Sequence, residues 1–165
     1  MSWRIRQAGY ADLEATARTK AESWAESLHE LVGDDAIRRQ RDPERISRTV
    51  AAWAGVLDGG GSIWLVVGDG GEVVGVAHAG IGRDEDAPTP LELAMIYLRT
   101  VAQGSGVADA LLEMAIGDAP AYLWVLSGNT RAQAFYRRHG FTFDGTTKPL
   151  DSLDTYKERW VRTGP

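Results

Sequence analysis

The sequence predicts an α+β fold built on a mixed, mostly antiparallel sheet of about seven strands flanked by about four helices. The segments 62–67 and 72–81 are rich in Val and Ile, which is typical of strands. Asp69-Gly70-Gly71 is a hairpin signal that joins two of the strands antiparallel. A single strand–helix–strand succession in the middle of the chain predicts one parallel crossover.

The first third of the chain predicts one short strand and two helices. Residues 3–7 form the strand. Asp42-Pro43 is a helix start, with Asp as the N-cap and Pro in the first turn. The two apolar stripes at helical spacing are Leu13, Ala17, Ala21, Trp24 and Leu28 for the first helix, and Ile46, Val50, Trp53 and Leu57 for the second.

The rest of the chain predicts six strands and two helices. The expected strands are residues 62–67, 72–81, 91–98, 122–126, 141–147 and 154–161. The expected helices carry the apolar residues Val107, Ala110, Leu111 and Met114, and then Ala132, Phe135, Tyr136 and His139. The loops 58–62 and 83–90 are too short to be domain linkers, so residues 1–165 are predicted to form a single domain.

Composition narrows the classes of function. The absence of cysteine excludes a disulfide framework, a thiolate metal site and a cysteine nucleophile, and no metal site is predicted. A net charge of -5 argues against binding to nucleic acid and leaves room for a cationic acceptor. The N-terminus lacks the apolar stretch of a signal peptide, and no run reaches the ~18 apolar residues of a membrane span. A cytoplasmic protein is therefore expected.

The segment 103–108 predicts a phosphate site. Its two glycines allow a ligand to approach the backbone, and the helix that follows presents unpaired N–H groups at its positive end. A strand-to-helix turn that needs glycine only for a positive φ is the alternative. A P-loop is excluded because no lysine follows, and a dinucleotide fingerprint fails because Asp109 occupies its third glycine position.

A second motif follows the predicted phosphate loop in the sequence. Gln-x-x-Gly-x-Ala at 103–108 is followed by Asn-x-x-Ala-x-x-Phe-Tyr-x-x-x-Gly-Phe at 129–141, with one helix and one strand between them. This pair of motifs resembles the two hallmarks of the GNAT superfamily of acyl-CoA-dependent N-acyltransferases. The likeness is detailed over residues 91–143. It departs from the family in Ser105, where a basic residue is frequent, and in the absence of proline from residues 99–102.

The resemblance implies an acetyl-CoA site and an amine acceptor. The backbone of the preceding strand would pair with pantetheine, Asn129 would hydrogen-bond its arm, and Ala132 would leave space beside it. Tyr136 would face the thiol. The strand residues are Ile96, Tyr97 and Leu98, and the pyrophosphate would lie on Gln103, Gly104, Ser105, Gly106, Val107 and Ala108.

Two catalytic roles follow from direct attack of an amine on the thioester. Tyr136, a phenol of pKa ~10, would protonate the leaving thiolate. Glu92 would take the proton of the acceptor amine directly or through water, and His78 is the rival base. The alternatives to these catalytic roles are that Tyr136 is only a core aromatic residue, that Glu92 faces solvent and that His78 has a structural role. A non-catalytic acyl-CoA-binding module on the same fold is the competing function.

The acceptor itself stays open among peptide N-termini, polyamines, amino acids and aminoglycosides. Trp24 is expected to line its pocket, whereas Trp53, Trp64 and Trp124 are expected in the core. The acidic run at 84–86 is predicted to be a solvated loop. No nucleic acid or membrane partner is expected, and a homodimer is compatible with this reading.

Overall fold

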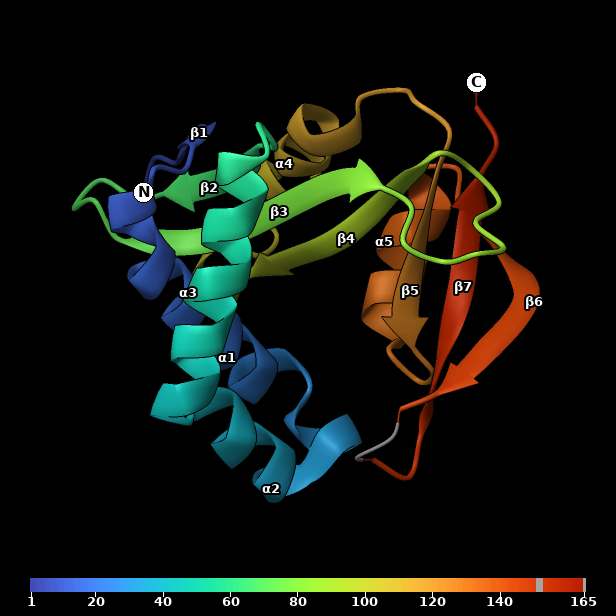
Figure 1. Cartoon of the computed structure of the whole chain (residues 1–165), viewed down its shortest axis with the longest axis horizontal. Helices are drawn as coiled ribbons and strands as arrows, with labels where there is room; N and C mark the ends of the chain where they lie inside the picture. Colours follow the sequence, from blue (N-terminus) through green and yellow to red (C-terminus); the bar gives the residue numbers. More distant parts are fainter. Residues whose placement is uncertain (151–152, 165) are drawn as a thin grey trace. The chain divides into compact units, whose positions relative to one another are not determined.

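The structure is a computed structural model that describes residues 1–150 and 153–164, and it confirms the predicted α+β class (Figure 1). One sheet has the strand order β1-β2-β3-β4-β5-β7-β6. β4 pairs with β5 in parallel, whereas β1–β2, β2–β3, β5–β7 and β6–β7 are antiparallel. The strands are β1 Arg4–Gln7, β2 Ile63–Val67, β3 Val73–Ile81, β4 Leu91–Leu98, β5 Ala121–Leu126, β6 Thr142–Pro149 and β7 Tyr156–Arg162. The helices are α1 Leu13–Ser27, α2 His29–Arg41, α3 Pro43–Asp58, α4 Val107–Ile116 and α5 Thr130–Arg138, with short 3-10 turns η1 Tyr10–Asp12 and η2 Thr100–Ala102.

The described residues divide into two compact units. The N-terminal unit comprises Met1–His78 and Met95–Gly117. The C-terminal unit comprises Ala79–Ala94 and the described residues from Asp118 onward. Each unit has its own set of buried side chains.

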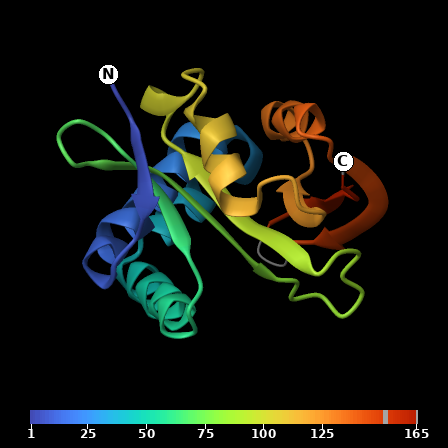
Figure 2. The same ribbon diagram turned by 90° about the horizontal axis from the view of Figure 1, so that it is seen from above.

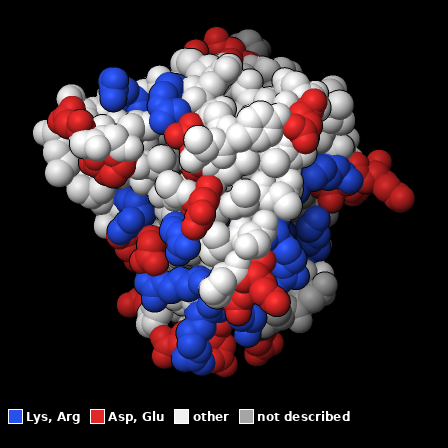
Figure 3. All heavy atoms as spheres, turned by 60° about the vertical axis from the view of Figure 1, so that its left-hand side comes forward, with Lys and Arg blue, Asp and Glu red and all other residues white. Residues whose placement is uncertain are grey.

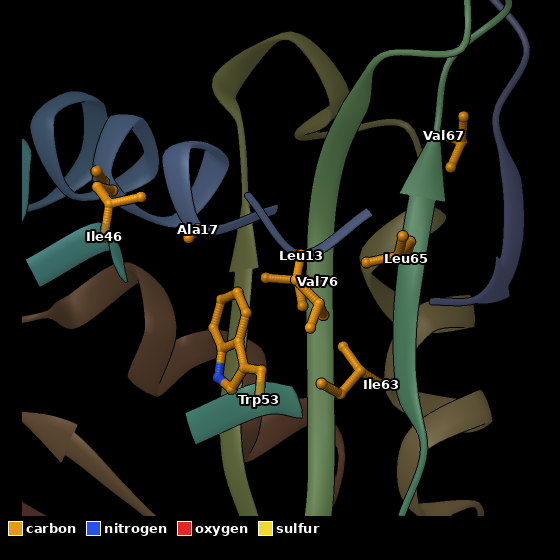
Figure 4. Packing of buried hydrophobic residues seen from close by; sticks show 9 residues of the cluster. Leu13, Ala17, Ile46, Trp53, Ile63, Leu65, Val67 and Val76 are labelled. Atoms are coloured by element: carbon orange, nitrogen blue, oxygen red, sulfur yellow. The ribbon is translucent and has the colours of Figure 1, made fainter. Parts of the chain in front are cut away.

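The core of the N-terminal unit forms where α1 and α3 meet β2 and β3. Figure 4 shows its side chains pointing toward one another from these four elements. Trp53 of α3 is 8% exposed, as expected from its place on the apolar stripe. Burial of this cluster holds the two helices on the sheet. Its fully or nearly fully buried members include Leu13, Ala17, Ile63, Leu65, Val67 and Val76.

A fifth helix, α2, was not indicated by the apolar spacing. α1 ends at Ser27, and the next helix begins at once with His29. α2 is polar, and Gly33 interrupts its helical backbone with φ 80°. Val32, Ala36 and Ile37 are nevertheless buried. Packing against α1 and α3, rather than local propensity, therefore accounts for this helix.

The C-terminal unit places α5 on one side of β5 and β7 (Figures 1 and 2). Phe141 and Trp160 are 0% and 3% exposed, and the Arg137 guanidinium lies 5.3 Å from the centre of the Trp160 ring. The loop between β3 and β4 crosses the other side of these strands. Asp84 in that loop accepts hydrogen bonds from Tyr122 and Trp124 of β5.

Charged side chains of both signs are interspersed on the face drawn in Figure 3. The N-terminal unit contains exposed ion pairs, such as Arg41 with Glu22 at 2.8 Å. Pairs of this kind contribute little to stability one by one, because water and salt screen them. No helix within the described residues is long and apolar enough to cross a membrane.

Candidate active site

The loop before α4 has the geometry of an anion cradle. Gly104 and Gly106 have φ of 76° and 83°, a region that residues with a Cβ avoid. A Cβ added at either glycine would meet nothing within 4 Å, so open space faces both. Gly106 is the N-cap of α4 and has no side chain to accept from the first N–H groups of the helix. These N–H groups and the helix dipole suit a phosphate.

Side-chain hydrogen bonds fix the conformation of this loop. The Gln103 amide nitrogen donates to the Leu98 carbonyl at 2.9 Å and to the Ser27 hydroxyl at 3.2 Å. The Ser105 hydroxyl donates to the Ala102 carbonyl at 2.6 Å. Ser105 therefore shapes the turn, and its side chain is not directed outward as a basic residue would be.

The preceding turn is tied to the C-terminal end of α1. Glu26 accepts from the Arg99 guanidinium at 2.7 Å and 2.9 Å and from the Thr100 N–H at 2.9 Å. The bonds from Arg99 hold the pKa of Glu26 below its usual value. This anchor stands where relatives are expected to carry a proline. Sequence reasoning missed it, since Glu26 and Thr100 lie 74 residues apart.

The strand segment Ile96, Tyr97 and Leu98 leads into this turn in the same unit. All three residues are half-buried in β4. Ile96 and Leu98 pack against a buried cluster that includes Ala102 and Val107. The strand, the turn and the first residue of α4 thus share one core, which fixes the loop relative to the strand.

The second motif forms the start and the inner face of α5. Asn129 is the N-cap, and its side-chain oxygen accepts from the Ala132 N–H at 3.3 Å. Its amide nitrogen is not used in this cap. Tyr136 is 8% exposed, with its ring edge-on to Phe135 at 5.5 Å and to Phe141 at 6.0 Å. The ring therefore belongs to the core stripe that the spacing predicted.

Glu92 does not face solvent. It is 2% exposed, and its carboxylate accepts from Arg83 Nε at 2.9 Å, Arg83 Nη2 at 2.7 Å and the Tyr122 hydroxyl at 3.3 Å. Burial alone would raise the pKa of Glu92, but the Arg83 bonds prevail and lower it. A carboxylate that is already ion-paired accepts a proton less readily than a carboxylate without a cationic partner.

The prediction of a solvated acidic run at 84–86 is wrong for Asp84, whereas Glu85 and Asp86 are exposed. Asp84 accepts from the Tyr122 hydroxyl at 2.9 Å, Trp124 Nε1 at 2.9 Å and Lys148 Nζ at 3.1 Å. Burial opposes ionisation, yet these three donors lower its pKa to about 2. The prediction failed because its partners lie 38 to 64 residues away in the sequence. Trp124 is likewise half-buried and hydrogen-bonded rather than a plain core residue.

His78 and Trp24 lie in the N-terminal unit. His78 Nδ1 lies 2.8 Å from the Ser62 carbonyl oxygen. A carbonyl oxygen only accepts, so Nδ1 carries the hydrogen and Nε2 of the neutral ring keeps its lone pair. Trp24 Nε1 is buried without a hydrogen-bond partner in the described part of the chain.

Known proteins share this sequence pattern and fold. A model of the acetyltransferase (GNAT) family matches residues 22–141. A protein of Mycobacterium tuberculosis named "Probable N-acetyltransferase" is 29% identical over 166 residues, which cover 92% of this chain and 88% of that protein. An uncharacterized N-acetyltransferase of Mycobacterium bovis is 35% identical over 82 residues, 46% of this chain and 50% of that one.

Two solved structures have the same fold. PaiA N-acetyltransferase from Thermoplasma acidophilum, crystallised with coenzyme A, gives a TM-score of 0.75 at 18% identity and 99% coverage of both chains. A GNAT phosphinothricin acetyltransferase from Sinorhizobium meliloti, in complex with AcCoA, gives 0.72 at 19% identity, covering 99% of this chain and 89% of that one. Since the family model spans most of its length, the chain belongs to the acetyltransferase (GNAT) family.

Proposed function

We propose that the protein is an N-acetyltransferase that moves the acetyl group of acetyl-CoA to a primary amine. The observation that carries the proposal is the exposed loop at the start of α4, where two glycines of positive φ have open space on their Cβ sides next to the N-terminus of the helix. Relatives crystallised with coenzyme A or AcCoA support acyl-CoA as the donor. The loop takes the pyrophosphate, and the backbone of Ile96–Leu98 pairs with the amide groups of pantetheine.

The residues of the second motif complete donor binding in this proposal. The amide nitrogen of Asn129, which takes no part in the helix cap, donates to the pantetheine arm, and the small side chain of Ala132 leaves room beside it. The ring of Tyr136 is held by Phe135 and Phe141, which restricts where its hydroxyl can lie. A group held in one position loses little entropy when it acts.

The reaction is a direct transfer with a balanced movement of protons. The neutral amine attacks the thioester carbonyl carbon, a C–N bond forms and the C–S bond breaks. The thiolate leaves with the bonding electron pair and takes the proton of the Tyr136 hydroxyl. The amine nitrogen gives up its proton to a base, and the Tyr136 phenolate regains a proton from solvent as the base releases the one it took. No covalent enzyme intermediate is needed.

Glu92 is the proposed base, acting through water, with His78 as its rival. The Arg83 pair weakens Glu92 as a direct proton acceptor. A water molecule that relays the proton would leave the pair in place. His78 has a free Nε2 lone pair in its neutral form and needs no such relay.

A thiol-release assay with a panel of primary amines tests the proposal. We expect acetyl-CoA-dependent release of free thiol that rises with amine concentration, and an acetylated amine by mass spectrometry. A non-catalytic acyl-CoA-binding module would bind coenzyme A in calorimetry but release no thiol above the rate of spontaneous hydrolysis.

A further inference from the structure

One face of the C-terminal unit carries a row of charged and aromatic side chains. In an antiparallel pair, residues opposite each other share a face, and every second residue along a strand returns to it. Trp124 lies opposite Arg159, and Leu126 lies opposite Lys157. Lys148 lies opposite Lys157 on the next strand. These side chains share the face on which the β3–β4 loop contacts Trp124, the face opposite α5.

Three of the four cations on this face are neutralised. Arg83 pairs with Glu92 at 2.7 Å, and Lys148 pairs with Asp84 at 3.1 Å. Arg159 pairs with Asp144 at 2.6 Å and with Asp86 at 3.0 Å. Every carboxylate of this group therefore already has its cation.

Lys157 is the cation left over. Within residues 1–150 and 153–164, no carboxylate lies within ion-pair distance of its ammonium and no hydrogen bond reaches it. It is half-buried and stands directly opposite Lys148, an arrangement of like charges that destabilises a sheet. Burial lowers the pKa of Lys157, and the nearby charges of Lys148 and Arg83 lower it further. Asp84 and Glu92 act in the opposite direction, but the pKa of Lys157 stays lowered, and an anion in direct contact with its ammonium would stabilise the charge further.

We propose that Lys157, with Trp124 and Lys148 beside it, binds an anionic group, and that the acceptor amine is therefore one that carries a carboxylate, such as a free amino acid. The inference rests on the proposed transferase function for the identity of the ligand. Lys148 already lies 4.2 Å from the centre of the Trp124 ring, so the wall of the site is held in place before a ligand arrives. Glu92, the proposed base, is close enough to Lys157 to act on its pKa. In this proposal the carboxylate of the acceptor lies at Lys157 and its amine on the side of Glu92.

An anion site at Lys157 discriminates between the classes of amine acceptor that the sequence left open. Polyamines and aminoglycosides bring only positive charge toward an unpaired lysine, which repels them. An amino acid brings a carboxylate that forms a charge-assisted hydrogen bond with the ammonium. The acidic overall charge of -5 does not decide the question, because what matters is the local pairing, in which Arg159 takes two carboxylates and Lys157 makes no ion pair within the described residues.

Kinetics with matched acceptors test the substrate class. Each L-amino acid is compared with its own C-terminal amide, in the wild type, Lys157→Met and Lys157→Arg. We expect the ratio of kcat/KM for acid over amide to fall about tenfold to a hundredfold in Lys157→Met. Lys157→Arg should keep most of the ratio, and the KM for acetyl-CoA should not change in either variant. An equal loss for acid and amide, or a preference for polyamines that Lys157→Met leaves intact, overturns the proposal.

A binding measurement that does not depend on catalysis tests separately whether Lys157 binds an anion. Inorganic sulfate is titrated against chloride at matched ionic strength, with the melting temperature as the readout. We expect sulfate to stabilise the wild type and Lys157→Arg more than Lys157→Met. Arg45→Met, which removes an exposed positive charge on α3, should respond as the wild type does. An equal response of Lys157→Met and the wild type refutes the anion site. If no amine releases thiol, the transferase proposal fails, and the sulfate titration alone then decides the site.

Discussion

Tyr136 combines a packed ring with a hydroxyl that the proposed chemistry needs. Tyr136→Phe keeps the contacts of the ring with Phe135 and Phe141, so the melting temperature should change little. Loss of a general acid costs on the order of 10²–10⁴ in rate. We expect the loss in kcat rather than in KM for acetyl-CoA, because the hydroxyl acts as the thiolate forms.

The control for this prediction is Tyr156→Phe, which removes the hydroxyl of a tyrosine that is 46% exposed. It should leave kcat and the melting temperature unchanged. An acyl donor with a more acidic thiol should reduce the deficit of Tyr136→Phe. Near-full kcat in Tyr136→Phe would mean that solvent protonates the leaving group and that the residue is only a core aromatic.

Glu92 is the residue at which base and structural roles must be separated. Glu92→Gln removes the charge that could accept a proton and also breaks the pair with Arg83. If Glu92 is the base, the rate deficit should shrink as pH rises, since the amine then loses its proton unaided. A pH–rate profile of kcat/KM measures this.

Arg83→Met is the matched control, because it breaks the same ion pair and keeps the carboxylate. Without Arg83 the pKa of Glu92 should rise, so proton acceptance should be preserved or improved. Equal deficits in both variants, independent of pH, would assign Glu92 to holding the loop and would leave His78 as the base.

At the scale of elements, the start of α4 depends on backbone that only glycine adopts easily. Gly106→Val places a β-branched side chain where phosphate approaches, at a φ of 83°. We expect calorimetry to show a loss of coenzyme A affinity of a hundredfold or more. Gly60→Val is the control, because Gly60 has the same φ of 83° and equally open space at its Cβ. A similar loss of stability in both variants, with coenzyme A affinity lost only in Gly106→Val, supports the site; unchanged affinity contradicts it.

Helix α1 contributes to this loop from a distance. Glu26 and Glu22 lie one turn apart on α1, and each bonds an arginine, but only Glu26 also accepts from the Thr100 N–H. Glu26→Gln should therefore weaken acetyl-CoA binding about threefold to tenfold with little change in kcat. Glu22→Gln should leave binding unchanged. Equal effects of the two substitutions would show that the anchor does not position the loop.

At the scale of the whole molecule, buried and bonded carboxylates set the acid limit of stability. The Arg6 bonds to Asp12, and the Trp124, Lys148 and Tyr122 bonds to Asp84, lower the pKa of each carboxyl to about 2. A lowered folded-state pKa stabilises the fold above the unfolded value of 3.8, and this contribution disappears as pH falls toward 2. The melting temperature should therefore drop most steeply between about pH 4 and pH 2.

Asp84→Asn tests this account in the C-terminal unit. It should lower the free energy of unfolding by about 1–3 kcal/mol at neutral pH, because three donors lose a charged acceptor. It should also make the fall of the melting temperature between about pH 4 and pH 2 less steep. Asp118→Asn, at an exposed position, should leave both unchanged. If the melting temperature of Asp84→Asn falls as steeply at acid pH as that of the wild type, the hydrogen bonds of Asp84 do not contribute to stability.

The order of elements and the phosphate loop could be predicted because their signals are local. Apolar alternation, the hairpin glycines and the Asp42-Pro43 helix start act over a few residues, and β4 has the predicted bounds of residues 91–98. The glycines of positive φ at 104 and 106 were likewise visible as a motif. Helix α2 escaped prediction because its own sequence is polar and broken by Gly33, so that only contacts with other helices stabilise it.

The sequence by itself determined the fold class, the family motifs and the residues of the proposed donor site, since each depends on spacing along the chain. The tertiary structure decided what surrounds them. The burial of Glu92 against Arg83, the three donors on Asp84 and the absence of an ion pair for Lys157 among the described residues arise from strand register and from a loop whose partners lie up to 64 residues away. Electrostatic pairing depends on distance in space, and spacing in the sequence does not encode which charges meet when strands align.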